Sequence, residues 1–315
     1  MNPPGKIKTP RFLTYLGFYL ALMLPSLGVA QLSVPEFFGD HMVLQRDRPI
    51  HIWGSAPHGS SISVQLGSDT SQAIADFSHY WQVTLPARPA GGPHQLRISG
   101  AGSTLVFDYV MMGEVWLCAG QSNMERPLKV SDNGYAVAAT ANYPNVRYFK
   151  VPRRLSTQPV TDIPGGQWWV CTPIRAENFS GVAFYFARDL HQSLGVPIGI
   201  IDISWGSTGI DTWISAEGLQ VFPPQEVRAD HPDNTDTLNA NDRPSLIYNG
   251  MVHPFKGLQM QGVVWYQGES DASSPHYYRN KQIKLIDDWR KQWCIGEFAF
   301  LVAQLANFRS LPTQP

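Results

Sequence analysis

The sequence of 315 residues has few cysteines, few charges and, beyond its N-terminal segment, no long apolar run. Its three cysteines, Cys118, Cys171 and Cys294, are too few for a disulfide scaffold or a dense metal cage. One bridge is possible after export, but the sequence does not pair them. Charged residues make up 16% and the formal net charge is -1, so nothing favours binding to nucleic acid or to an acidic membrane surface. With 43% hydrophobic residues, the chain is expected to be globular with a sizeable core.

The N-terminal segment has the pattern of a secretory signal. Three basic residues within residues 6–11 precede an apolar run over residues 12–24, and small residues occupy positions 28–30. The run is short for a membrane span, so residues 1–30 are predicted to be a cleaved signal peptide, with an uncleaved anchor as the alternative. We therefore expect an exported protein, periplasmic or extracellular, that does not associate with the membrane after cleavage.

Residues 31–108 have a β pattern throughout. Residues 62–66 and residues 81–85 alternate apolar and polar side chains with a period of two, and segments rich in proline and glycine separate such runs. This pattern predicts a small antiparallel β-sandwich domain. The segment contains no group of side chains suited to catalysis.

From residue 109 to residue 315, apolar strands alternate with helical patterns, which predicts an α/β domain with a parallel sheet. The expected strands cover residues 115–118, 198–203, 263–266 and 298–302. Helices are expected after Ser180, around residues 245–252, and over residues 277–293, where Ile283, Ile286, Trp289 and Trp293 fall on roughly one face.

The polar segment of residues 223–243 is predicted to be a surface loop or an insertion. Its adjacent Asp230 and His231 resemble a metal pair, but neighbouring residues rarely share a metal, and a solvated loop is the better interpretation.

Three of the expected strands end in small polar clusters, Gly-Gln-Ser-Asn, Trp-Gly-Ser-Thr and Gln-Gly-Glu-Ser-Asp. Parallel strands end at the same edge of a sheet, so these clusters can converge. Ser122 then supplies a nucleophilic hydroxyl, and the backbone N–H groups of Ser122 and Gly206 with the Gln267 amide supply donors for an oxyanion. Glu269 is placed where it can orient a histidine. The simpler alternative is that Ser122 only caps the next helix.

These clusters carry a resemblance to a known family. Residues 113–124, 204–208 and 265–271 resemble the motifs of the sialate O-acetylesterase family, secreted carbohydrate esterases of the SGNH hydrolase superfamily. Residues 38–46 also resemble the start of the β domain in its bacterial members, so the likeness runs from about residue 31 to the end.

The resemblance implies a flavodoxin-like three-layer hydrolase domain that removes O-acetyl groups from sugars without a cofactor or metal. Ser122 would be the nucleophile, Gly206 and Gln267 the oxyanion donors, and Glu269 an acidic partner near the site. Ser207 stands where the family usually has a second glycine, although its backbone N–H is retained.

The general-base histidine of the family lies in an Asp-x-x-His motif beyond the strand expected at residues 298–302, and this sequence ends before reaching it. We therefore expect a chain truncated at its C-terminus and inactive as given. Asp76 and His79 match the motif's letters only by chance, since they precede the nucleophile. His253 is interpreted as structural, and His276 is the least unsuitable substitute.

Two classes of function remain open. The first is an O-acetylesterase whose partner is an O-acetylated sugar, either acetylated sialic acid or an acetylated plant polysaccharide such as xylan. The second is a non-catalytic carbohydrate-binding protein derived from such an esterase. A lipase-like hydrolase is less favoured, because no Gly-x-Ser-x-Gly elbow surrounds Ser122.

Overall fold

The computed structural model describes residue 1 and residues 31–227 and 240–306. The chain divides into two compact units, Met1–Ala30 and Gln31–Pro315, and the second is described here. Apart from its first residue, the expected signal peptide lies outside the described residues, as does most of the predicted polar loop. No helix among the described residues has the length and apolarity needed to cross a membrane.

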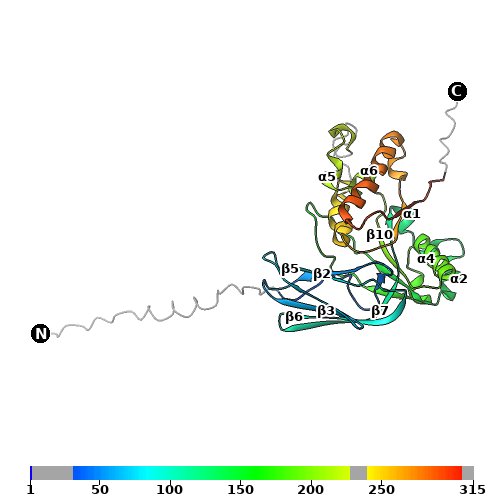
Figure 1. Ribbon diagram of the computed structural model, residues 1–315. Helices are drawn as coiled ribbons and strands as arrows, with labels where there is room; N and C mark the ends of the chain where they lie inside the picture. Colours follow the sequence, from blue (N-terminus) through cyan, green and yellow to red (C-terminus); the bar gives the residue numbers. More distant parts are fainter. Residues whose placement is uncertain (2–30, 228–239, 307–315) are drawn as a thin grey trace, which may run out of the picture. The chain divides into compact units, whose positions relative to one another are not determined.

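The first part of the second unit consists mainly of antiparallel strands, drawn blue to cyan in Figure 1, whereas β1 pairs in parallel with residues 111–113. β3 pairs with β4 and β6, and β2 pairs with β5. Both sheets bury their apolar side chains in one core, to which β2 contributes Ile52 and β3 contributes Ile62. The bounds are β1 (Val43–Gln45), β2 (Ile50–Ser55), β3 (Ser61–Leu66), β4 (Asp69–Ile74), β5 (Tyr80–Leu85) and β6 (Gly91–Gly100).

The long strand β7 (Ser103–Gly120) joins this part to the rest of the unit. Its first half pairs antiparallel with β6, and its second half pairs in parallel with β10 and β11. Side chains alternate between exposed and half-buried at its start, whereas all are buried from Val110 onward. The boundary predicted at residues 108 and 109 therefore falls inside one continuous strand, and an independent sandwich domain stays a prediction.

The second half of β7 lies at the centre of a parallel sheet ordered β12-β11-β7-β10-β8, with β9 antiparallel at the edge. Numbered along the chain, its parallel strands follow the order 2-3-1-4-5, which differs from the 2-1-3-4-5 order of flavodoxin. β8 and β9 were not predicted. The bounds are β8 (Tyr143–Lys150), β9 (Trp168–Cys171), β10 (Ile198–Ser204), β11 (Gly262–Tyr266) and β12 (Ala299–Val302).

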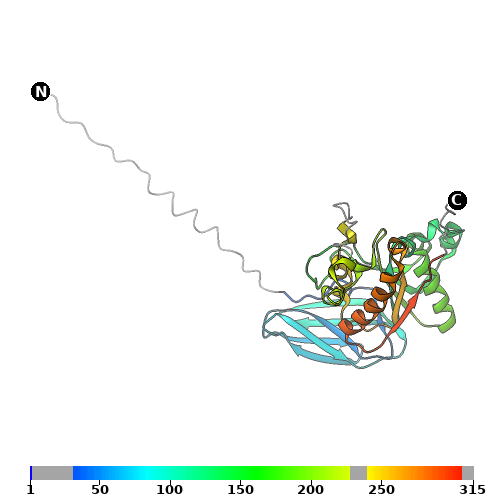
Figure 2. The ribbon, with the colours of Figure 1, turned by 90° about the horizontal axis from the view of Figure 1, so that it is seen from above.

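Helices cover both faces of this sheet, so the parallel part has three layers, as predicted (Figures 1 and 2). α4 packs on one face and α6 on the other. Ser180 caps α4 by accepting a hydrogen bond from Ala183 N at 3.1 Å, and Gly195 ends it with φ 67°. The bounds are α1 (Ser122–Glu125), α2 (Gly134–Thr140), α3 (Pro173–Ala176), α4 (Gly181–Leu194), α5 (Ala216–Leu219) and α6 (Pro275–Trp293).

The predicted apolar face of α6 is wrong at one position. Ile283 is 53% exposed, although the two tryptophans of that face are buried. Lys281 and Asp288 are buried instead, because Lys281 Nζ lies 2.8 Å from Asp211 and Asp288 accepts hydrogen bonds from Ser215 N and Oγ at 2.8 and 2.7 Å. Paired charges can occupy a helix face that hydrophobicity alone would assign to apolar residues.

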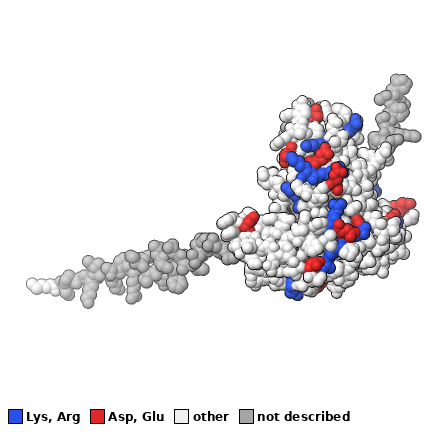
Figure 3. Space-filling view, viewed as in Figure 1, with Lys and Arg blue, Asp and Glu red and all other residues white. Residues whose placement is uncertain are grey.

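Positive and negative side chains are mixed on the face shown in Figure 3, where they gather mainly over the helices and do not form a large patch of one sign.

Candidate active site

Three strand ends meet at one edge of the parallel sheet. In the registers of β7 with β10 and β11, Gly120 pairs with both Ser204 and Tyr266, so the three strands end at the same level. Two backbone hydrogen bonds tie the exits together: Trp205 N donates to Gly120 O at 3.0 Å, and Gln121 N donates to Tyr266 O at 3.0 Å. The structure thus brings the three predicted polar clusters side by side.

Gly120 makes this crossing possible. Its φ is +145°, and a Cβ there would lie 2.0 Å from the Tyr266 carbonyl oxygen. Only glycine fits both the backbone angle and the space. The next residues can therefore turn directly from the buried strand into α1.

Ser122 is the first residue of α1 and is exposed at this edge. Within the described residues, its Oγ has no hydrogen-bond partner, so the hydroxyl is not used as a cap. A Cβ at Gly206 would lie 3.6 Å from Ser122 Cβ, which places the loop after β10 directly beside the serine. The Ser122 side chain and the loop after β10 are therefore close enough to contact one small ligand.

Gln267 links the loops of all three strands. Its Nε2 donates to Thr208 O at 2.9 Å and to Asp271 Oδ2 at 2.6 Å, and it lies 3.2 Å from Gln121 Oε1. Gln121 Oε1 also accepts a hydrogen bond from Gly268 N at 3.2 Å. The amide hydrogens of Gln267 are thus directed at protein acceptors rather than at open space.

The backbone N–H of Gly206 is also occupied. It donates to Glu125 Oε2 at 2.8 Å, and Arg153 donates to the other oxygen of that carboxylate. The Arg153 guanidinium lies 5.1 Å from the centre of the Trp205 ring. A carboxylate therefore sits where the sequence predicts that an oxyanion would bind.

Glu269 lies next to the serine through Asn123, whose Nδ2 donates to Glu269 Oε1. Its other oxygen, Oε2, is buried and has no hydrogen-bond partner in the described part of the chain. An acid held in this way retains one free acceptor oxygen, which is what the orientation of a second polar group requires.

Ser207 has φ 58°, a left-handed conformation that glycine adopts without strain. This geometry gives a physical reason for the glycine that the family usually has at this position, and it shows that serine is accommodated here.

No described histidine hydrogen-bonds to Ser122. His253 Nδ1 pairs with Val160 O at 2.8 Å, and burial lowers the pKa of this imidazole. His79 Nδ1 accepts from His58 N at 3.2 Å within the antiparallel part. His276 is exposed at the start of α6, its ring 3.9 Å from that of Tyr277. Asp230 and His231, the adjacent pair in the polar loop, both lie outside the described residues.

Cysteine and metal chemistry have little support at this edge. Burial raises the pKa of Cys118 well above its usual value and that of Cys171 to about 11, so both thiols stay protonated at neutral pH. All three cysteines are unpaired, and Cys294 alone is exposed. Over residues 31–227 and 240–306, no cluster of three or more His, Cys, Asp or Glu side chains has the geometry to hold a metal ion.

Sequence reasoning missed several residues of the edge, namely Gln121, Asn123, Glu125, Arg153 and Asp271. Gln121 and Asn123 lie inside the serine motif and Glu125 directly follows it, so proximity to Ser122 was a signal that could have found all three. Arg153 had no such signal, because it follows β8, a strand that hydrophobic patterning did not reveal.

An exposed serine after the central strand of a three-layer parallel sheet, flanked by the loops of both neighbouring strands, lies at the edge where α/β folds bind ligands and carry out chemistry. The family described as carbohydrate esterase, sialic acid-specific acetylesterase, matches residues 112–314, and the chain belongs to this family.

Individual relatives agree. The chain is 30% identical over 328 residues to the sialate O-acetylesterase of Homo sapiens and 29% identical over 323 residues to that of Mus musculus. These alignments cover 92% and 87% of this chain and 61% and 60% of the relatives. A crystal structure of a carbohydrate acetylesterase from Xanthomonas citri is 38% identical, with a TM-score of 0.79, covering 87% of this chain and 60% of that one. The chain thus spans about 60% of the length of these relatives.

Proposed function

We propose that the protein is an exported serine esterase that removes O-acetyl groups from carbohydrate. The observation that carries this proposal is the exposed Ser122 hydroxyl beside Gly206, which has no hydrogen-bond partner among the described residues and lies where three strand ends meet. The family membership and the acetylesterase names of its relatives support the acetyl ester as the bond that is cleaved.

In this proposal Ser122 Oγ loses its proton to a general base and attacks the acetyl carbonyl carbon. The sugar oxygen leaves as the alcohol, and water then releases acetate from the acetyl-serine. The backbone N–H groups of Ser122 and Gly206 stabilise the oxyanion, which requires the Glu125 carboxylate to release Gly206. The oxyanion role of Gln267 stays a prediction, since its amide hydrogens already bond to Thr208 and Asp271.

The general base is the component that the described residues do not provide. The free Oε2 of Glu269 is suited to accept a hydrogen bond from an imidazole and so to orient it toward Ser122. Without a base the serine is a weak nucleophile, because the members of such a group act as a unit.

The second candidate is a carbohydrate-binding protein without catalysis. The absence of a described histidine at Ser122 favours it, whereas the free hydroxyl and the neighbouring backbone donor favour the enzyme.

We also propose that residues 31–108 form a β-sandwich domain and that residues 1–30 are removed on export.

Acetate release tests the proposal. Acetylxylan and a 9-O-acetylated sialoside are incubated with the protein expressed from its complete reading frame and with its Ser122→Ala variant. We expect release from at least one substrate, with turnover lowered at least about 10³-fold in the variant. Equal rates for the two proteins, or binding without release, would establish the non-catalytic alternative. Mass spectrometry of the exported protein tests whether its N-terminus lies near residue 31.

A further inference from the structure

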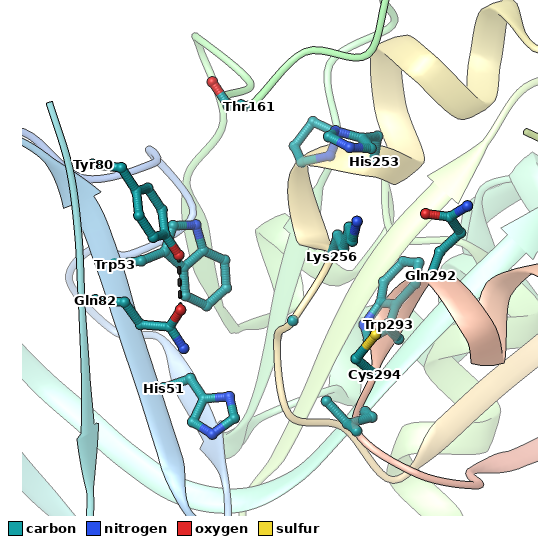
Figure 4. A pocket seen from close by; sticks show the side chains of 13 residues that line it. His51, Trp53, Tyr80, Gln82, Thr161, His253, Lys256, Gln292, Trp293 and Cys294 are labelled. Atoms are coloured by element: carbon teal, nitrogen blue, oxygen red, sulfur yellow. Dashed lines mark hydrogen bonds between the residues drawn. The ribbon is translucent and has the colours of Figure 1, made fainter. Parts of the chain in front are cut away.

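A pocket of about 380 Å³ lies between the β2–β5 sheet and the C-terminal end of α6 (Figure 4). We call it the Tyr80 pocket. One wall carries His51, Trp53, Tyr80 and Gln82, and the opposite wall carries His253, Lys256 and Trp293. A second hollow of about 570 Å³ adjoins it and shares Trp53, Tyr80 and Thr161 with it. This size suits a small organic ligand.

The first wall arises from the alternation of side chains on two paired strands. β2 and β5 point Ile52 and Val83 into the core and turn the neighbouring side chains outward. Trp53 is on the outward face but is only 9% exposed, because it packs against Phe37 and Phe38. The sheet thus presents a fixed aromatic floor.

Tyr80 stands at the rim of this floor and is 44% exposed. Its hydroxyl donates to Gln82 Oε1 at 2.9 Å, which holds the ring and leaves the Gln82 amide hydrogens available (Figure 4). Aromatic rings of this kind present an apolar face beside a polar tip.

The opposite wall offers both an acceptor and a donor. His253 Nδ1 donates to Val160 O at 2.8 Å, and burial lowers the pKa of the ring, so a neutral imidazole keeps Nε2 as an acceptor. Lys256 is exposed and forms no ion pair with any described residue. Among the described residues, no carboxylate lines the Tyr80 pocket itself, and Asp162 lines the adjoining hollow.

Trp293 forms the apolar base of the opposite wall. It lines the pocket and is 1% exposed. Its ring therefore adds apolar surface opposite Tyr80 and Trp53, which suits a ligand with apolar faces and polar edges.

We propose that the Tyr80 pocket binds a pyranose unit of a glycan. A sugar ring has apolar C–H faces for Tyr80 and Trp53, hydroxyl oxygens for Lys256 and the Gln82 amide, and hydroxyl hydrogens for His253 Nε2. The proposal is independent of the chemistry at Ser122. α6 separates the two sites: it begins just beyond the Glu269–Asp271 turn and ends at Trp293, and its 19 residues rise about 28 Å. A ligand that reached both sites would be a chain of several sugars.

Calorimetry with xylohexaose and with 3′-sialyllactose tests this assignment and separates a neutral chain from an acidic sugar. The full chain is compared with Tyr80→Ala, with Lys256→Ala and with Tyr135→Ala, a control that removes a 66% exposed tyrosine outside the pocket. We expect saturable binding of at least one probe, weakened about three- to tenfold in the two pocket variants and unchanged in the control. The Ser122→Ala variant should bind as the wild type does.

A second readout is the indole N–H resonance of Trp293, assigned by its loss in Trp293→Phe, which should shift on titration with the bound probe. The proposal is overturned if the wild type binds neither probe, or if Tyr80→Ala and Tyr135→Ala bind with equal affinity. Loss of binding in Ser122→Ala would also overturn it, because the ligand would then lie at the serine edge. Failure of acetate release leaves these outcomes unaffected.

Discussion

The serine edge and the Tyr80 pocket differ in how far their polar groups bond to one another. At the edge, the Gln121 side chain, the Gln267 amide nitrogen and the Gly206 N–H all form hydrogen bonds within the protein, whereas Ser122 Oγ, Gln267 Oε1 and Glu269 Oε2 have no partner among the described residues. In the pocket, Lys256 is exposed and forms no ion pair with a described residue. The edge is therefore a hydrogen-bonded frame around one exposed hydroxyl, whereas the pocket presents polar groups that a ligand can bond.

The largest expected effect is the loss of stability when Gly120, at the centre of the serine edge, is replaced. Gly120→Ala places a Cβ 2.0 Å from the Tyr266 carbonyl, so the strand exits must separate. We expect the free energy of unfolding to fall by more than about 4 kcal/mol, or the chain not to fold. Gly59→Ala is the control: its φ is +79° and no atom lies within 4 Å of the new Cβ, so only the backbone cost of about 1–2 kcal/mol applies. Equal losses in denaturant unfolding would contradict the crowding argument.

Gln267→Leu tests the frame against the pocket directly. It leaves Gln121 Oε1 and Thr208 O without the amide that bonds to them, which we expect to cost about 1–3 kcal/mol of stability. Gln82→Leu, in the Tyr80 pocket, should change stability by less than about 0.5 kcal/mol. Urea unfolding of both variants provides the measurement, and similar losses would show that the two regions are not built differently.

Glu125→Ala asks whether the occupied N–H of Gly206 limits the reaction. The bound carboxylate competes with an oxyanion for one hydrogen, at about 1 kcal/mol, so its removal should raise kcat/KM roughly fivefold. Glu217→Ala, which removes an exposed acid paired with Lys291, serves as the control. A slower Glu125→Ala enzyme would instead mean that Glu125 holds the Gly206 loop in place.

The smallest expected effect is a loss of stability in acid that depends on His253 in the wall of the Tyr80 pocket. Burial lowers the pKa of His253 in the folded chain, so its contribution to stability is complete above the unfolded value of about 6.5 and is lost as the pH falls below that value and through the lower pKa of the folded chain. Burial likewise lowers the pKa of His41 and His94. Unfolding measured between about pH 7.5 and about pH 5.5 should show stability falling with acid, less steeply in His253→Asn. If stability falls equally steeply with acid in the variant and the wild type, then His253 does not cause this pH dependence.

The edge was largely predictable because each cluster is contiguous in sequence and follows an apolar strand. Parallel strands end together, so local motifs of four or five residues were enough to bring Ser122, Gly206 and Gln267 to one place. The motifs did not show which hydrogen bonds each polar group forms. Whether the Gln267 amide is free or bonded to Thr208 depends on side-chain directions that appear only in three dimensions.

The pocket was not predictable for the opposite reason. His51, Tyr80, His253 and Trp293 come from segments far apart in the sequence, and no one segment carries a motif. β8 was missed for a related reason: Arg147 and Lys150 interrupt its apolar pattern, and Lys150 is accommodated through an ion pair with Asp202 at 2.8 Å. The hydrophobic pattern of a sequence reveals an apolar face, but it does not reveal a charged residue within a strand whose charge is balanced by an ion pair.

Covalent trapping of the serine tests the central claim most directly. Diethyl 4-nitrophenyl phosphate reacts with an activated serine, which displaces 4-nitrophenolate and forms a phosphoryl ester. With the protein from its complete reading frame, we expect mass spectrometry to find one modified residue, Ser122, and no modification of the Ser122→Ala variant. A label on another residue, or equal labelling of the variant, would contradict the claim that the three strand ends are built around this hydroxyl.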